Sequence, residues 1–287
     1  MIDTHVHLSY RYFKNTFPYI FYKKDDFGII YGDRNSLISE MKATGISCCI
    51  EPATDVDSNR LLLELSHENP GYIYPAVGNH PTRCIRSSLK DFKIVKECAK
   101  DESVVAIGET GLDYHYDRKD QHRIRQRIWF EWQINLADKL RLPLILHIRM
   151  ADDDAIAVLR NNQRKLHGGV CHCFGGGAEV AKVYTEELGL YLGIGGTLLM
   201  RPEISEALMD TVRNTDIKYI VLETDGPYVK PSKPGNITKK KWRKARNTSL
   251  ILPAVAQKIA DIKGMDVMDV IEISDANARR LFGITPV

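Results

Sequence analysis

The chain has 287 residues, of which 44% are hydrophobic and 27% are charged, and its net charge is only +3 at pH 7. This length predicts a single domain over residues 1–287, and the small net charge leaves the question of a polyanionic partner to local clusters of charge. No apolar leader and no run of about 18 apolar residues is present, so we expect a cytoplasmic protein without a membrane span.

Short runs rich in β-branched residues alternate with longer segments of helical spacing, such as the one that contains Trp132, Leu136 and Leu140. The first run is MIDTHVHL, and the others cover residues 46–52, 72–78, 104–109, 142–148, 168–174, 190–195 and 219–225. Eight repeats of strand and helix predict an α/β fold, the closed (β/α)8 TIM barrel. An open doubly wound sheet is the alternative, but no G-x-G-x-x-G motif follows a strand.

Two segments interrupt this alternation. Residues 9–34, between the first strand and the first helix, contain nine aromatic and five basic residues. Residues 230–246, after the eighth strand, contain eight Lys or Arg and no acid. Both segments follow the carboxyl ends of strands, which is the end of such a barrel that carries the chemistry.

Polar side chains end five of the predicted strands. His5 and His7 end the first strand and share a face, because side chains two apart in a strand point the same way. The others are Glu109, His147, His172 and Asp225. A lone histidine there is usually a core residue and a lone aspartate a helix cap, but the whole set favours metal ligands. Imidazole and carboxylate suit zinc, manganese and similar ions, so the sequence predicts a two-metal site.

The segments DTHVHL, VGNHP, IGETGLDY, LILHIR, CHCF and LETDGP occur in that order. In order and spacing they resemble the TatD family of metal-dependent deoxyribonucleases, in the amidohydrolase-like superfamily, and the match extends to ANARRLFG near the end of the chain. The resemblance implies two divalent ions, Mg, Mn or Zn. One would be held by His5, His7 and Asp225, and the other by His147 and His172, with Glu109 between them.

Two ions about 4 Å apart can activate a shared water and neutralise the oxygens of a phosphoryl displacement. We predict that Asp225 is the base that accepts the proton of this water. Glu223 lies two residues earlier on the same face and is predicted to orient a ligand, with a buried ion pair to an arginine as the alternative. His80, which the resemblance places near the site, is predicted to contact or protonate the leaving group, with a turn histidine as the alternative.

Several residues are predicted to bind substrate. Arg149 is positioned to hold a phosphate through its guanidinium fork, and the basic run beside Trp242 could follow a sugar-phosphate backbone and stack a base. The predicted contacts of the basic segment are Lys239, Lys240, Lys241, Trp242, Arg246 and Asn247, the last two because they match a family loop. The aromatic residues of the first interruption could stack bases, form the core of a lid or bind a partner protein; they include Tyr10, Tyr12, Phe13, Phe17, Tyr19, Phe21 and Tyr22.

The preferred hypothesis is a TatD-like nuclease that binds DNA and cuts its phosphodiesters, in single strands or frayed ends. A two-metal hydrolase of small amides, lactones or phosphate esters is the second. A subunit that acts only within a complex, through the aromatic segment, is the third. The chain departs from the family around RNTS and HCFGG, which affects the expected substrate more than the expected chemistry.

Overall fold

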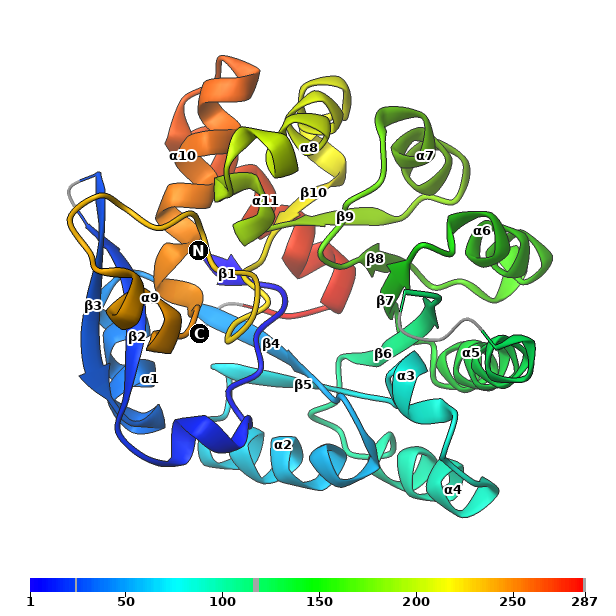
Figure 1. The fold of residues 1–287 in the computed structure, drawn as a ribbon. Coiled ribbons are helices and arrows are strands. Elements are labelled where there is room, and N and C mark those ends of the chain that lie inside the picture. Colours follow the sequence, from blue (N-terminus) through cyan, green and yellow to red (C-terminus); the bar gives the residue numbers. More distant parts are fainter. Residues whose placement is uncertain (24, 116–118, 286–287) are drawn as a thin grey trace.

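The computed structural model describes residues 1–23, 25–115 and 119–285, without the side chain of Tyr12. Its main sheet has eight parallel strands whose spatial order follows the chain (Figure 1). They are β1 (Ile2–Asp3), β4 (Cys48–Pro52), β5 (Ile73–Val77), β6 (Ala106–Asp113), β7 (Leu144–Arg149), β8 (Gly169–Cys171), β9 (Tyr191–Ile194) and β10 (Ile220–Leu222). The first and last strands also meet: the Thr4 N–H donates to the Leu222 carbonyl at 3.0 Å, and Val6 pairs with Gly226. The predicted TIM barrel is confirmed.

Helices surround the sheet (Figure 1). They are α1 (Arg34–Ala43), α2 (Val56–Glu68), α3 (Pro81–Cys84), α4 (Leu89–Cys98), α5 (Asp120–Leu140), α6 (Asp152–Asn161), α7 (Ala178–Lys182), α8 (Pro202–Asn214), α9 (Lys239–Lys244), α10 (Leu252–Lys263) and α11 (Val267–Phe282). Their ends follow from local sequence: the Asp55 side chain accepts the Ser58 N–H at the start of α2, and Gly264 ends α10 at φ 63°.

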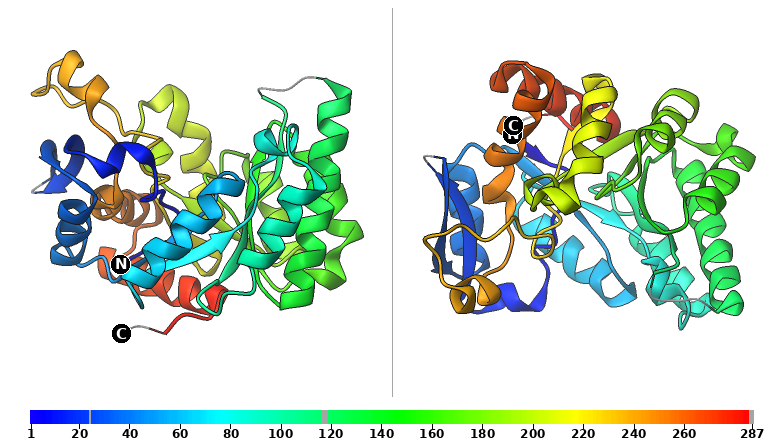
Figure 2. Two further views of the ribbon diagram at one scale, coloured as in Figure 1. Left: turned by 90° about the horizontal axis from the view of Figure 1, so that it is seen from below. Right: turned by 45° about the horizontal axis from the view of Figure 1, so that its top comes forward.

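The interior of the barrel is apolar below the predicted site. Ile145, Val170 and Val221 are buried in one cluster, and each precedes a polar site residue by two positions. Because alternate residues share a face, these side chains fill the barrel beneath the polar ends of the strands. Leu281 and Phe282 of α11 join the same cluster, so this helix covers the end of the barrel opposite the site (Figure 2).

The aromatic segment forms a hairpin of two antiparallel strands, β2 (Phe17–Lys23) and β3 (Asp26–Gly32), after a short 3-10 turn. Phe13, Phe17 and Tyr19 are buried in the main core, with ring centroids 4.6 Å apart for the first pair and 5.2 Å for the second. These three buried rings attach the hairpin and the turn before it to the barrel. Tyr31 points outward and is 66% exposed.

The basic segment lies against this hairpin. The Ile20 N–H donates to the Arg246 carbonyl and the Arg246 N–H donates to the Pro18 carbonyl, both at 2.9 Å. The ring of Phe27 packs on Trp242 at 6.5 Å. The two interruptions of the repeat are thus neighbours, and Figure 2 shows the hairpin and α9 on one side of the barrel. Among the described residues, no helix combines the length and apolar character needed to cross a membrane.

Candidate metal centre

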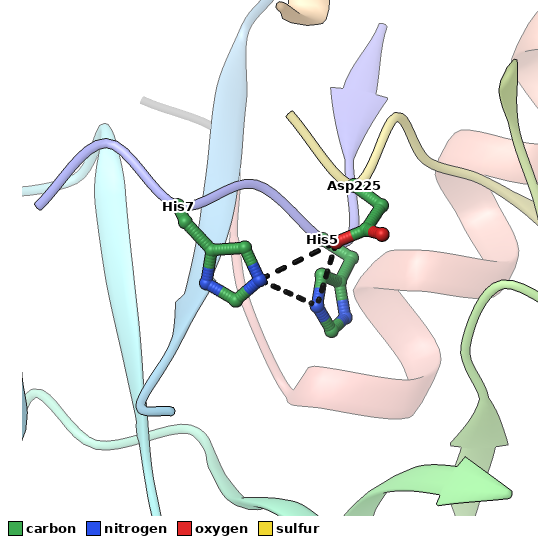
Figure 3. A group of neighbouring side chains, drawn as sticks. All are labelled: His5, His7 and Asp225. Carbon is green, nitrogen blue, oxygen red and sulfur yellow. Dashed lines mark hydrogen bonds and ion pairs between the residues drawn. The ribbon is translucent and has the colours of Figure 1, made fainter. Parts of the chain in front are cut away.

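The first group of potential ligands joins the two ends of the barrel sheet. The Nε2 atoms of His5 and His7 are 3.2 Å apart, and Asp225 Oδ1 lies 3.8 Å from the first and 3.4 Å from the second (Figure 3). The Asp225 N–H donates to the His5 carbonyl at 2.9 Å, which holds the aspartate beside the histidines. Residues from opposite ends of the chain therefore converge because the barrel closes here.

The second group comes from neighbouring strands on the other side of the mouth. His147 Nδ1 and His172 Nε2 are 2.9 Å apart, and Glu109 Oε2 lies 3.4 Å from the first and 3.2 Å from the second. His80, the residue before α3, brings its Nε2 to 3.6 Å from the same carboxylate oxygen. Sequence analysis placed His80 near the leaving group, and the structure places it beside this second group.

Glu109 is shared between the two groups. Its Oε1 atom lies 3.5 Å from His5 Nε2 and 3.4 Å from His7 Nε2, whereas its Oε2 atom faces His147 and His172. The side chain is only 3% exposed. One carboxylate oxygen for each group is the arrangement that the family resemblance implies.

The donor atoms fit divalent ions. Histidine nitrogens bind zinc at about 2.1 Å, so two ligands of one ion lie about 3 Å apart, as these facing nitrogens do. Three overlapping sets have their ligand atoms within 4.8 Å of one another: His5 with His7 and Asp225, His5 with Glu109 and His172, and His80 with Glu109 and His147. Burial raises the pKa of Glu109, but the neighbouring His172 and His147 outweigh it and hold that pKa well below its usual range.

The histidines are fixed from behind as well. His147 Nε2 lies 3.1 Å from Asp113 Oδ2, and His7 Nδ1 lies 3.2 Å from the Pro52 carbonyl. Such partners set the orientation of a ligating imidazole. Sequence analysis missed Asp113 because it expected the fourth strand to end at Glu109, whereas β6 continues to Asp113. The signal was present in IGETGLDY, because its second acid, Asp113, lies at the carboxyl end of that strand.

Glu223 lies behind His172 and not in the cavity. Its Oε1 accepts the N–H of Cys173 at 2.5 Å, and the carboxyl group packs against Gly193. Burial and the nearby Asp225 raise its pKa well above the usual range. It forms no ion pair with any residue that the structure describes, so the arginine alternative does not apply. Its contact is with the backbone next to His172, and the orienting role stays a prediction.

The mouth opens into a cavity of about 1350 Å³ that His7, His80, Glu109 and Arg149 help to line. Arg11 and Arg83, which sequence analysis did not select, also line it. Lys239, Lys240 and Lys241 are exposed on α9, at the edge of the basic segment. Arg246 is half-buried, and its backbone pairs with the hairpin.

Two predicted substrate contacts have positions that do not suit that role. Trp242 is 8% exposed and packs on Phe27, so little of its ring could meet a base. Asn247 is fully buried, and its amide donates to the carbonyls of Thr224 at 2.7 Å and Val229 at 3.1 Å. It holds the loop after β10. We therefore correct both assignments. The basic run of the sequence did not reveal that the hairpin covers Trp242 or that the loop after β10 covers Asn247.

The closed barrel and the histidines and carboxylates at its mouth define a metal-dependent hydrolase. A family described as TatD related DNase matches residues 2–283, and the chain belongs to this family. It is similar to the uncharacterized metal-dependent hydrolase YabD of Bacillus subtilis, with 30% identity over 284 residues that cover 99% of both chains. It is also similar to the 3'-5' ssDNA/RNA exonuclease TatD of a Rahnella species, with 30% identity over 253 residues that cover 88% of this chain and 93% of that one. The crystal structure of YJJV, a TatD homologue from Escherichia coli, has the same fold, with a TM-score of 0.82, 24% identity and coverage of 99% and 98%.

Replacing Asp113 with Asn should weaken metal binding about 10- to 100-fold, because the carboxylate that orients His147 is then absent. The measurement is metal affinity by isothermal titration calorimetry. The matched control is Asp138→Asn, which removes a carboxylate 2.9 Å from His167 Nε2 away from the site and should leave the affinity unchanged. Equal affinities for Asp113→Asn and the unmodified protein would contradict the assignment of Asp113.

Metal binding should release protons at neutral pH. Burial lowers the pKa of His7, but Asp225 and Glu109 outweigh it and raise that pKa to about 9, and Asp113 and Glu109 do the same for His147. Both imidazoles are therefore positively charged at pH 7, and each must lose one proton when it binds a metal. The metal affinity should rise with pH and level off above about pH 9. Calorimetry in buffers of different ionisation enthalpy should show release of about two protons at pH 7. Release that does not fall between pH 7 and pH 10 would contradict this expectation.

Proposed function

We propose that this protein is a two-metal nuclease that hydrolyses phosphodiester bonds of DNA, in single strands or frayed ends. The observation that carries the proposal is the position of Glu109, whose two oxygens each face a separate pair of histidines at the floor of a cavity. Two-metal sites of this kind suit in-line phosphoryl displacement. The relatives named as 3'-5' ssDNA/RNA exonucleases add support for a nucleic-acid substrate.

Two divalent ions held by these residues would activate a water and neutralise charge on the phosphate oxygens. The carboxylate of Asp225 has a pKa below its usual value, because His7 and the other histidines outweigh the effect of burial, so it is ionised at neutral pH. Its Oδ1 faces His5 and His7. Its Oδ2 is the atom that we assign to accept the proton of the attacking water.

His80 is assigned to the leaving oxygen. Its Nδ1 accepts the N–H of Thr82 at 3.2 Å. Burial and the nearby His147 lower its pKa to about 3, so the ring is neutral and its proton lies on Nε2. That N–H points toward the Glu109 side of the cavity. In this role His80 donates a hydrogen bond to the phosphate or leaving oxygen and need not give up its proton.

The cavity lining carries charges of both signs, and its three arginines are the groups that could hold phosphates. Arg11, Arg83 and Arg149 line it, and the exposed Lys239, Lys240 and Lys241 of α9 lie outside this lining. Three aspartates also line it. Asp55 precedes α2, Asp57 lies in the first turn of α2, and Asp152 is the first residue of α6. We assign the arginines to phosphates within the cavity and the lysines to the strand that leaves it.

The purified protein should cut end-labelled single-stranded DNA in the presence of Mg, Mn or Zn and not in EDTA. Asp225→Asn should lower the rate at least about 100-fold through removal of both a ligand and the base. Asp216→Asn is the control, since it removes an exposed carboxylate that pairs with Lys218 at 3.0 Å. Metal content is measured on each variant. Hydrolysis of small phosphate esters without any cleavage of oligonucleotides would support the small-molecule hydrolase instead.

Replacing Lys239, Lys240 and Lys241 with alanine should weaken binding of single-stranded DNA. For every phosphate that these lysines neutralise, the replacement should reduce the slope of log affinity against log salt by about 0.7. Fluorescence anisotropy at several salt concentrations measures both the affinity and the slope. The control removes the same charge from exposed Lys90, Lys93 and Lys96 of α4, on the other side of the barrel (Figure 1). Equal slopes for the two triple variants would contradict the assignment of α9.

A further inference from the structure

One wall of the cavity is aromatic. Tyr10, from the segment after β1, and Tyr228, from the loop after β10, both line it, with ring centroids 5.7 Å apart at an interplanar angle of 64°. The ring of Tyr228 also meets the ring of His7, at 5.8 Å and 73°. Tyr228 is 45% exposed and Tyr10 is half-buried. We call this pair the aromatic wall; it adjoins the metal-ligand group and keeps ring surface open to the cavity.

The backbone before Tyr10 is fixed by buried polar contacts. The Glu51 carboxylate is fully buried and accepts the N–H groups of Leu8 at 3.1 Å and Ser9 at 2.6 Å. Arg34 donates to the carbonyls of the same two residues at 2.7 and 3.3 Å. Beyond Tyr10, the buried ring of Phe13 attaches the chain to the core. Tyr10 is therefore held in place before any ligand arrives, unlike a residue of a mobile lid.

The loop that carries Tyr228 is fixed in the same way. The Tyr228 N–H donates to the Asp225 carbonyl at 2.7 Å, and the buried amide of Asn247 donates to the carbonyls on either side of this turn, those of Thr224 and Val229. A tyrosine needed only to pack behind His7 would be buried by its neighbours. The backbone of Tyr228 is instead held by these hydrogen bonds while 45% of the residue is exposed, which suits contact with a ligand.

The position and chemistry of the wall identify a ligand class. A nucleotide whose phosphate lies at the metal ligands carries its base one sugar away, within reach of the Tyr228 ring that contacts His7 and of the Tyr10 ring beside it. Aromatic side chains stack on every base because each base has a π-face. Arg11, the next residue in the chain, lines the same cavity and adds positive charge beside the rings. A paired base has both faces covered by its neighbours in a duplex, whereas a base in an unpaired strand can stack on protein.

We propose that Tyr10 and Tyr228 form a stacking site for the unpaired base that adjoins the scissile phosphate. The inference rests on the proposed nuclease function and gives it a source of selectivity. It also gives the aromatic segment a role at the site. The buried rings of the hairpin hold the segment on the barrel, and Tyr10 is a ring that the described part of the segment contributes to the cavity.

The test compares cleavage of two oligonucleotides, one of natural sequence and one with an abasic nucleotide next to the cleaved bond. On the natural strand, Tyr10→Ala should lower kcat/KM about tenfold, and Tyr10→Phe should recover most of that decrease, because the stacking face returns. On the abasic strand the effect of Tyr10→Ala should shrink to less than about twofold, since there is no base to stack. Tyr31→Ala, which removes an exposed ring from the outer face of the hairpin, should change neither rate.

A spectroscopic measurement separates stacking from support of the fold. With 2-aminopurine at the same nucleotide and Asp225→Asn to prevent cleavage, binding should quench the fluorescence, and adding Tyr10→Ala should remove most of the quenching. Metal content and thermal unfolding are measured on every variant. Equal decreases on the natural and abasic strands, or quenching that survives Tyr10→Ala, would overturn the inference while leaving the nuclease function intact. No cleavage of the natural strand by the unmodified, metal-loaded protein would overturn the nuclease function first and this inference with it.

Discussion

The carboxylate of Glu109 is the constraint on which the site depends. It is buried among the rings of His5, His7, His147 and His172, and an isolated charge there would be costly to desolvate. It remains ionised because imidazoles approach both of its oxygens, one pair on each side. An open sheet could not surround a single carboxylate in this way. The closed barrel is therefore a requirement of the site as well as its scaffold.

Closure in turn depends on polar contacts between the first and last strands. Asp3 is fully buried, and it accepts the N–H and hydroxyl of Thr224 at 3.1 and 2.6 Å and the N–H of His5 at 3.1 Å. Burial raises its pKa to about 6, with these hydrogen bonds opposing the rise. The contacts fix the register of β1 against β10, and this register brings His5 and Asp225 together.

The sequence predicts the barrel and the residues at its mouth because both depend on short-range patterns. Runs of apolar residues repeat eight times, and the H-x-H spacing predicts that His5 and His7 lie together, although both follow β1, which ends at Asp3. The arrangement behind the ligands depends instead on contacts between distant segments. Asp113 becomes a partner of His147 only because β6 and β7 pair, and Asn247 holds the β10 loop only because the chain returns to it. Trp242 looks like a binding residue in a basic run, yet the hairpin covers it.

The aromatic segment shows how composition and role can differ. Its many rings resemble a binding surface, but Phe13, Phe17 and Tyr19 are buried because a two-stranded hairpin has little stability alone and must pack on something larger. The hairpin packs on the barrel and pairs with the backbone of the basic segment at Arg246, and these contacts hold both segments in place. The buried rings help to offset the entropic cost of ordering these residues, and among the side chains that the structure describes, the ring of Tyr10 remains at the cavity. An insertion of this kind can change what the mouth of the barrel binds while the metal ligands stay on the strands or just beyond their ends, so one barrel can keep its chemistry and alter its substrate.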